Sequence, residues 1–257
     1  MQVTTTRVPI GVVAAIIPWN SQMLLTAVKL APALAMGNTV VIKASELAPV
    51  TLLEFAKLIE KTGMPKGVVN IITGLGDPCG KALTQHHLVE RIAFTGGPET
   101  ARHIVKNSSY NLSQVSLELG GKSPVAVFDD ADQENALNGI TAGIFGASGQ
   151  SCIAGSRLYI QSSIYEIFLN KLIDKAKKIK LGPPMSDETQ MGPLNSLKQL
   201  EVIEKNINDT VQQGGVIKCG GKRSSFSNKG YYFPATIIEC ENHNLPTAEN
   251  ELFGPVL

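Results

Sequence analysis

The chain has 257 residues, a formal net charge of +1, 43% hydrophobic residues and 18% charged residues. This length allows one large domain or two medium ones with an ample core, and the composition is ordinary for a globular protein. The balanced charge lacks the footprint of a protein that binds nucleic acid or anionic membranes. The longest apolar run, residues 8–19, is interrupted by prolines and is shorter than the roughly 20 residues that span a bilayer. We therefore expect no nucleic-acid or membrane partner.

Strand-like apolar runs alternate with helical patterns along the chain. We predict strands at residues 8–17, 39–43, 68–72, 91–94, 114–119, 124–128, 157–161 and 235–240. We predict helices at residues 24–36, 49–63, 130–145 and 163–179, and a further helix that begins at Pro98. This alternation favours an α/β fold with largely parallel sheets. Residues 219–229 are predicted to form an exposed loop, and the glycine pair at 120–121 is the predicted domain boundary.

Cysteine and histidine spacing indicates neither disulfides nor a metal site. The four cysteines form no C-x-x-C pair, and the four histidines show no metal-ligand spacing. In a chain of this length the cysteines indicate reduced intracellular thiols. We expect Cys79, Cys219 and Cys240 to be buried structural residues and predict no bound metal.

Cys152 differs from the other cysteines because small residues surround it in the loop "GASGQSCIAGSR". Small neighbours leave its sulfur accessible, so a thiolate there can attack an electrophilic carbon. Its own N–H is one donor for the resulting oxyanion. The amide of Asn20, at the end of the strand in "IIPWN", is the candidate second donor, provided that this end of the strand faces the same space.

Glu118 stands at the end of the predicted strand 114–119, next to two glycines, in "ELGGKSP". A buried carboxylate is costly unless it is paired or takes part in chemistry. We therefore expect Glu118 to serve either as a base or as one partner of a structural pair.

Three strand–turn–helix junctions resemble phosphate-binding loops: "VIKASELAP", "IITGLGDPCG" and "IAFTGGPET". The second misses the G-x-G-x-x-G spacing by one residue. The third offers free N–H groups at the start of the helix opened by Pro98, where a phosphate is favoured. Each loop alone is more often a turn than a cofactor site, but three in succession favour a nucleotide-binding unit.

Together the motifs resemble one family. The order and spacing of "PWN" (18–20), "KASE" (43–46), "FTGG" (94–97), "ELGGKSP" (118–124), "GQSC" (149–152), "LGPPMSDETQMGPL" (181–194) and "ENELFGPV" (249–256) are similar to those of the NAD(P)-dependent aldehyde dehydrogenase superfamily. The resemblance covers the chain from Arg7 to its last residue. It implies a Rossmann-type NAD-binding domain at residues 1–119 and an α/β catalytic thiol domain at residues 120–257.

The resemblance also implies an activity, the oxidation of an aldehyde to a carboxylic acid with NAD. In that scheme Cys152 forms a thiohemiacetal, and the Asn20 amide and the Cys152 N–H hold its oxyanion. Hydride loss leaves a thioester on Cys152. Glu118 then activates the water that hydrolyses this thioester.

Cofactor residues follow from the same resemblance. Lys43 and Glu46 resemble the pair that contacts the adenosine ribose; a carboxylate attracts a 2′-hydroxyl and repels a 2′-phosphate, so Glu46 favours NAD over NADP. The turn Thr95, Gly96 and Gly97 matches the pyrophosphate site, although the family usually has serine in place of Gly97. The remaining implied cofactor residues are Ile16, Trp19, Gly76, Gly80, Phe94 and Leu119, with Glu251 and Phe253 at the nicotinamide ribose and ring.

Several positions depart from the family pattern around the substrate. Ser21 and Gln22 replace a common aromatic–proline pair, Val28 stands where tryptophan is frequent, and Gly146 stands where an aromatic is common. With Leu25, these residues predict a wide substrate tunnel that is poor in aromatic side chains.

Two alternatives stay open. Relatives that pass the acyl group to coenzyme A lack the glutamate at position 118, so Glu118 argues against that activity here. The second alternative is an inactive NAD-binding fragment, because family members are longer at both ends. We expect a truncated chain of this kind to show impaired activity and weakened assembly. The full-length protein is expected to be cytoplasmic and to form a homo-dimer or tetramer.

Overall fold

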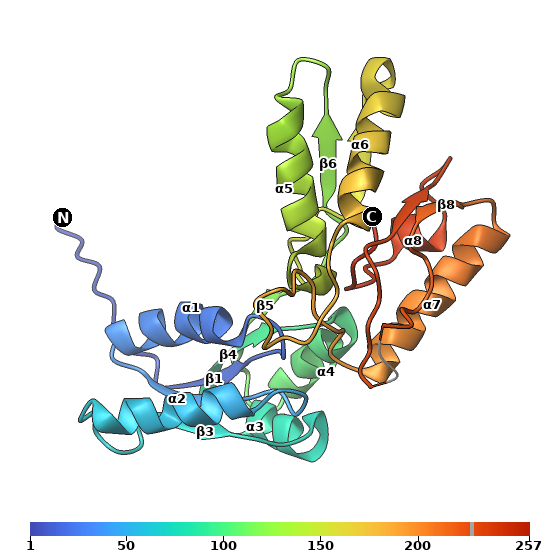
Figure 1. The fold of residues 1–257 in the computed structure, drawn as a ribbon. Helices are drawn as coiled ribbons and strands as arrows, with labels where there is room; N and C mark the ends of the chain where they lie inside the picture. Colours follow the sequence, from blue (N-terminus) through green and yellow to red (C-terminus); the bar gives the residue numbers. More distant parts are fainter. Residues whose placement is uncertain (227–228) are drawn as a thin grey trace. The chain divides into compact units, whose positions relative to one another are not determined.

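The computed structural model describes residues 1–226 and 229–257, so part of the predicted 219–229 loop, residues 227–228, lies outside the described residues. The chain divides into two compact units, Met1–Gly120 and Gly121–Leu257 (Figure 1). Each unit contains both strands and helices. The roles predicted for the two domains stay predictions.

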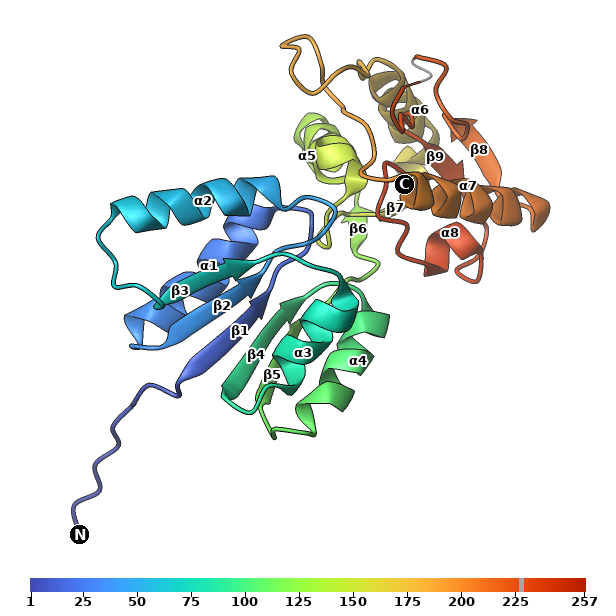
Figure 2. The same cartoon turned by 90° about the horizontal axis from the view of Figure 1, so that it is seen from below.

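The first unit is built on a five-stranded parallel sheet with the order β3-β2-β1-β4-β5 (Figure 2). Its strands are β1 (Val12–Ile16), β2 (Thr39–Lys43), β3 (Val69–Ile72), β4 (Val89–Thr95) and β5 (Gln114–Glu118). The chain fills one side of β1 first and then returns to place β4 on the other side. In such sheets the crevice at the carboxyl ends of the two strands where the order reverses is the usual nucleotide site.

Helices cover both faces of this sheet. They are α1 (Gln22–Ala35), α2 (Val50–Lys61), α3 (Lys81–Gln85) and α4 (Pro98–Ser108), with a π-helical turn, η1 (Gly76–Gly80). Val13 and Ala15 of β1 pack in one cluster with Leu30 of α1 and Leu52 of α2.

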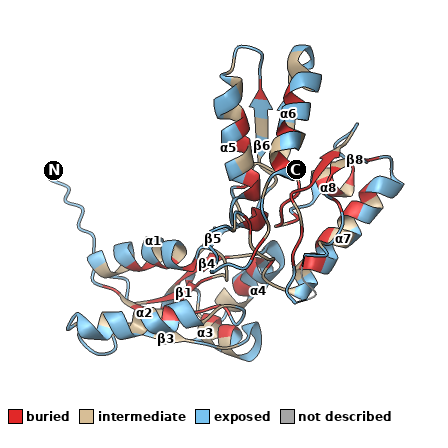
Figure 3. Ribbon diagram, viewed as in Figure 1, coloured by how far each residue is buried: buried red, intermediate tan, exposed pale blue. Residues whose placement is uncertain are grey.

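The alternate residues of β1, Ala14 and Ile16, pack in a second cluster with Ala101 and Ile104 of α4. Side chains alternate between the faces of a strand, so the two clusters bury β1 on both sides. Figure 3 colours each residue by its burial.

The second unit contains two two-stranded sheets and four α-helices within its described residues. Its strands are the parallel pair β6 (Pro124–Val127) and β7 (Arg157–Ile160) and the antiparallel pair β8 (Val216–Cys219) and β9 (Ile237–Glu239). Its helices are α5 (Gln133–Phe145), α6 (Tyr165–Lys177), α7 (Leu197–Gln212) and α8 (Pro246–Glu249), with short 3₁₀ turns η2 (Gly146–Gly149) and η3 (Ser162–Ile164).

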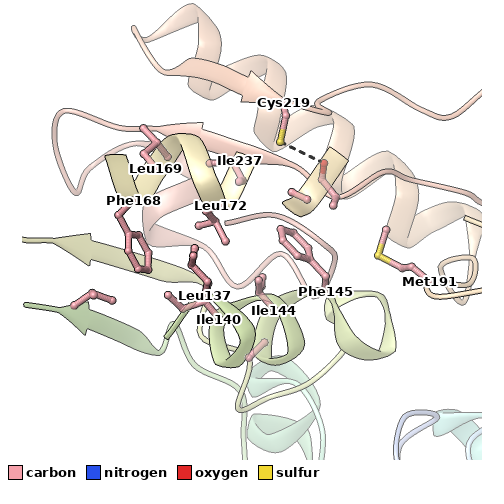
Figure 4. Close-up of a cluster of buried hydrophobic side chains, with 14 residues drawn as sticks. Leu137, Ile140, Ile144, Phe145, Phe168, Leu169, Leu172, Met191, Cys219 and Ile237 are labelled. Atoms are coloured by element: carbon pink, nitrogen blue, oxygen red, sulfur yellow. Dashed lines mark hydrogen bonds between the residues drawn. The ribbon is translucent and has the colours of Figure 1, made fainter. Parts of the chain in front are cut away.

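Two hydrophobic clusters hold this second unit together. In the first, Leu137, Ile140 and Ile144 lie on one face of α5 and pack toward Phe168 and Leu172 of α6 (Figure 4). Their spacing of three and four residues is that of one helix face. The second cluster forms around Leu200, Ile203 and Ile207 of α7 and includes Leu194, Phe233, Leu252 and Val256.

Some details differ from the sequence predictions. Strand β8 and helix α7 were not predicted. Cys219, assigned to an exposed loop, ends β8 and is buried against Ala235 and Ile237, so the loop starts after it. Among the cysteines expected to be buried, Cys219 is buried, whereas Cys79 and Cys240 are only half-buried.

Candidate functional site

The predicted site residues of the first unit gather at the carboxyl edge of its sheet. Ile16, which ends β1, lies beside Lys43 of β2 on one side and Phe94 of β4 on the other. Thr95, which ends β4, lies beside Glu118, which ends β5. Parallel strands present their carboxyl ends at one edge, so residues as distant in sequence as Ile16 and Phe94 become neighbours.

Asn20 lies in the turn that joins β1 to α1. The chain leaves the sheet at Ile17, whose N–H donates to the Lys43 carbonyl at 3.1 Å. Trp19 and Asn20 follow and are half-buried. The Gln22 side-chain amide donates to the Trp19 carbonyl at 3.1 Å and to the Ala48 carbonyl at 2.5 Å. These two bonds tie the turn that carries Asn20 to the segment preceding α2.

Glu118 is exposed, so the expectation of a buried carboxylate is wrong. The physical reason is its place at the end of β5, an edge strand that pairs with β4 alone. The Glu118 carbonyl accepts the Gly96 N–H at 3.1 Å, a backbone bond that does not involve the side-chain carboxylate.

Lys29 of α1 also belongs to this edge, a position that was not predicted from the sequence. Its Nζ donates to the Thr95 hydroxyl at 2.6 Å. Burial lowers the pKa of Lys29, while the negative charge of Glu118 opposes that shift. The signal in the sequence was a single lysine within the apolar helical run "LLTAVKLAPALA".

Lys43 and Glu46 form an ion pair of 2.8 Å, with the Lys43 side chain only 6% exposed and the Glu46 side chain 43% exposed. Burial raises the pKa of Glu46, but the hydrogen bond and charge of Lys43 outweigh it, and the net shift is downward. Glu46 therefore stays charged at the rim of the sheet edge, with its outer face open to a ligand.

The glycine turn that follows β4 leads directly into α4. Gly97 is the N-cap residue of this helix, Pro98 is its first residue, and no side chain caps its free N–H groups. A Cβ built at Gly97 would meet no atom within 4 Å, whereas one at Gly96 would lie 2.5 Å from the Phe94 ring. The turn therefore leaves an open approach to the positive end of the helix dipole.

The other predicted cofactor residues of this unit differ in exposure. Ile16 and Phe94 are buried in the cluster beneath the edge. Leu119 is 39% exposed, and Gly76 and Gly80 begin and end the turn η1, with Gly80 buried.

Cys152 of the second unit is half-buried and follows an unusual loop. Ala147, Ser148 and Gly149 have φ values of 49°, 56° and 70°, three left-handed residues in succession. Non-glycine residues seldom adopt this conformation, so neighbouring contacts must hold it. Gln150, two residues before Cys152, accepts the Asn195 N–H through its side-chain oxygen at 2.8 Å.

Glu251 and Phe253 lie in the segment after α8, in the same unit as Cys152. Phe253 is half-buried with a left-handed φ of 53°. Partial burial raises the pKa of Glu251, while the Gly121 N–H and the Lys122 charge oppose this shift. Burial and the nearby Arg157 charge lower the pKa of Lys122 to about 8, against the opposing charges of Glu251 and Cys240. Lys122 was not singled out from the sequence, although it stands inside the "ELGGKSP" motif.

The predicted residues therefore form two groups. Asn20, Glu118 and the cofactor residues up to Leu119 belong to the first unit, as does Lys29. Cys152, Glu251 and Phe253 belong to the second unit. Within residues 1–226 and 229–257 there is no cluster of three or more potential metal ligands, and no helix of that part is long and apolar enough to cross a membrane.

Comparisons with known proteins point in one direction. The model of the aldehyde dehydrogenase family matches residues 1–257. A (Z)-2-((N-methylformamido)methylene)-5-hydroxybutyrolactone dehydrogenase of Acinetobacter baylyi is 55% identical over 100% of this chain and 52% of its own length. A betaine aldehyde dehydrogenase of Bacillus subtilis is 42% identical over 98% of this chain and 52% of its own length. The chain thus spans about half the length of the curated relatives it matches.

Solved structures agree with this result. A betaine aldehyde dehydrogenase from Staphylococcus aureus, crystallised in complex with NAD+, superposes with a TM-score of 0.94 at 41% identity, over 97% of this chain and 50% of that one. The predicted α/β fold of the aldehyde dehydrogenase type is thereby confirmed.

Proposed function

Because the chain belongs to the aldehyde dehydrogenase family, we propose that the whole protein oxidises an aldehyde to a carboxylic acid with NAD+. The observation that carries the proposal is the family match over residues 1–257, a range that contains every predicted catalytic and cofactor residue. We assign Cys152 as the nucleophile, Glu118 as the general base and Asn20 as an oxyanion donor.

The carboxyl edge of the first sheet fits a dinucleotide. The free N–H groups at the start of α4 and the open space at Gly97 suit a pyrophosphate, and the charged Glu46 suits a ribose hydroxyl. The Staphylococcus aureus relative was crystallised with NAD+, which supports the same cofactor here. When bound, NAD+ supplies the acceptor for the hydride that leaves the substrate carbon.

Cys152 carries the substrate through the reaction. Its thiolate bonds to the aldehyde carbon, and the electron pair of the carbonyl moves to oxygen. The N–H of Cys152 and the side-chain amide of Asn20 donate to this oxyanion, which exists only after attack, so these bonds favour the transition state over the bound aldehyde. Loss of hydride from the carbon restores the carbonyl and leaves a thioester on Cys152.

Glu118 completes the cycle by hydrolysis. Its carboxylate accepts a proton from water as the water oxygen bonds to the thioester carbon. The carbon–sulfur bond then breaks, the thiolate of Cys152 returns, the carboxylic acid leaves, and Glu118 releases the proton to solvent. The exposed position of Glu118 supports this role, because the carboxylate needs access to water rather than enclosure in a core.

The experiment that tests the proposal follows NADH formation by the protein that contains this chain, over a panel of aldehydes. Cys152→Ala is expected to abolish turnover, and Cys240→Ala, a change at another half-buried thiol, is expected to preserve it. Glu118→Gln is expected to lose steady-state turnover while a first burst of NADH remains. Full activity in the Cys152→Ala protein would refute the proposed function.

The substrate is proposed to be larger than a small flat aldehyde. Val28 is 55% exposed on α1, and a Cβ placed at Gly146 would meet no atom within 4 Å, which supports a wide tunnel poor in aromatic residues. The Acinetobacter baylyi relative is named for a substituted hydroxybutyrolactone. The aldehyde panel therefore includes bulky and hydroxylated substrates beside acetaldehyde, and a higher kcat/KM for the bulky ones is expected.

A coenzyme A-acylating enzyme would require coenzyme A for turnover. Aldehyde oxidation without added coenzyme A therefore distinguishes hydrolysis of the thioester from acyl transfer. Cytoplasmic location and homo-oligomeric assembly rest on the family resemblance, and cell fractionation and light scattering test them.

A further inference from the structure

The motif at residues 181–194 has no part in the proposed chemistry, yet its end lies against the loop that carries Cys152. Gly192 and Asn195 each form a hydrogen bond with that loop. We propose that residues 191–195 brace the Cys152 loop, and that Gln150 and Ser148 are positioning residues that fasten it there. The inference rests on the proposed role of Cys152.

The brace is itself fixed in the protein. Met191 is 2% exposed in the cluster formed by α5 and α6, and Leu194 is 3% exposed in the cluster around α7. The Leu194 N–H also donates to the Tyr231 carbonyl at 2.9 Å. Because its two ends are anchored in two different hydrophobic clusters, the segment between them is a rigid support.

Two side chains of the loop reach this support. The buried Ser148 donates its hydroxyl to the Gly192 carbonyl at 2.9 Å. The Gln150 oxygen accepts the Asn195 N–H at 2.8 Å, and its nitrogen donates back to the Ala147 carbonyl at 3.2 Å. Gln150 therefore connects the brace to the first left-handed residue of the loop.

The segment that carries Phe253 also contacts the loop. A Cβ at Gly149 would collide with the Gly254 carbonyl and lie 2.7 Å from the Pro255 nitrogen, so these backbones are in direct contact. Gln199 of α7 donates to the carbonyls of Leu252 and Phe253 and holds that segment in turn. The loop thus contacts two fixed segments, residues 191–195 and residues 252–255.

This arrangement explains how three consecutive left-handed residues persist. Such a conformation survives only where the surroundings over-determine it, and here the hydroxyl of Ser148, the amide of Gln150 and the Gly149–Gly254 contact do so. The consequence concerns catalysis, because Cys152 follows Gln150 by two residues. Releasing the loop would displace both the thiolate and the N–H that holds the oxyanion.

The test compares Gln150→Met with Gln190→Met in the protein that contains this chain. Methionine keeps the side-chain length, but its sulfur is only a weak acceptor for the Asn195 N–H and it has no N–H to donate to Ala147. Gln190 is the matched control, because its oxygen also accepts a backbone N–H, but from Lys180, at 2.9 Å. Ser148→Ala removes the second link independently.

Gln150→Met and Ser148→Ala are each expected to lower kcat about tenfold to a hundredfold, with the KM for the aldehyde nearly unchanged. Amide hydrogen exchange in residues 146–152 is expected to accelerate in both variants and to stay at the parent rate in Gln190→Met. An unchanged kcat or an unchanged exchange rate in both loop variants overturns the inference. The exchange measurement does not depend on activity, so it still tests the brace if Cys152→Ala shows that the proposed function is wrong.

Discussion

Two glycine-bearing loops, one in each unit, use glycine in opposite ways. At Gly97, before α4, the backbone is extended with φ −77° and ψ 155°, and a side chain would meet no atom within 4 Å. At Gly149, before Cys152, φ is +70°, and a side chain would collide with the Gly254 backbone. The first glycine leaves space that a ligand or a hydroxyl can use. The second is required by the protein's own packing. A glycine in a motif therefore indicates a structural requirement where the chain itself fills the Cβ space or where φ is left-handed.

The largest expected effect comes from Gly149→Ala. The new Cβ would meet backbone atoms, which cannot rotate away, and the left-handed φ adds about 1–2 kcal/mol for a residue with a side chain. We expect a loss of about 3 kcal/mol or more in the free energy of unfolding, measured by denaturant titration, and loss of turnover. Gly146→Ala is the control, because Gly146 has φ −55° and open space around its Cβ position. Equal stability of the two variants would contradict the comparison.

Gly96→Ala tests whether a neighbouring side chain restricts a glycine as the backbone does at Gly149. Gly96 is adjacent to Gly97 but faces the packed Phe94 ring. Its Cβ would lie 2.5 Å from the Phe94 ring, and Phe94 is 3% exposed in the cluster beneath the sheet edge. The ring must move to make room, at a cost of about 1–3 kcal/mol. Thermal unfolding measures the loss. Gly97→Ala, one residue on, is expected to cost less, and a reversed order would show that the ring adapts freely.

Much of the first unit could be predicted from the sequence because its signals are local. The apolar runs at 39–43 and 68–72 became β2 and β3 within a residue, and α4 begins at Pro98 as predicted. Helix α7 was not predicted, although Ser196 caps it and Leu200, Ile203 and Ile207 recur at helical spacing. That signal was present in the sequence.

The remaining features depend on contacts between distant residues. The contact of Gly149 with Gly254 and the exposure of Glu118 follow from which strands and loops become neighbours. Neither the spacing of the glycines nor the apolar run before Glu118 contains that information. The roles of the site residues stay predictions, since they rest on the family resemblance.

The Lys43–Glu46 pair extends the comparison to another open position of the first unit, with a smaller expected effect. The pKa of Glu46 is lower in the folded state than its ordinary value of 4.5. The charged carboxylate therefore stabilises the folded state fully above pH 4.5, and this contribution is lost as the pH falls through the lowered pKa. Glu46→Gln is expected to remove this part of the acid dependence and to cost about 0.2–1 kcal/mol at neutral pH, because the carboxylate is partly solvated. Denaturant titration from acidic to neutral pH measures both effects.

The same variant tests cofactor choice. A carboxylate at the ribose repels a 2′-phosphate, so the parent protein is expected to have a higher kcat/KM with NAD than with NADP. Glu46→Gln is expected to reduce this ratio. Retention of the full ratio in the variant would show that another group sets the preference.

Gly97→Ser has the smallest expected effect, and its sign is opposite to the others. The extended backbone of Gly97 is that of an N-cap, no side chain caps α4, and the open space accepts a serine without displacement. A hydroxyl there can accept an N–H from the first turn of the helix, which is worth a few tenths of a kcal/mol relative to glycine. The same hydroxyl can donate to a pyrophosphate, so the Kd for NAD+ is expected to fall about 2- to 10-fold. Thermal unfolding and calorimetric titration measure the two effects.

Gly97→Ala is the control, because it adds a side chain without a hydroxyl. If the alanine variant also binds NAD+ more tightly, the gain comes from the backbone rather than from the hydroxyl.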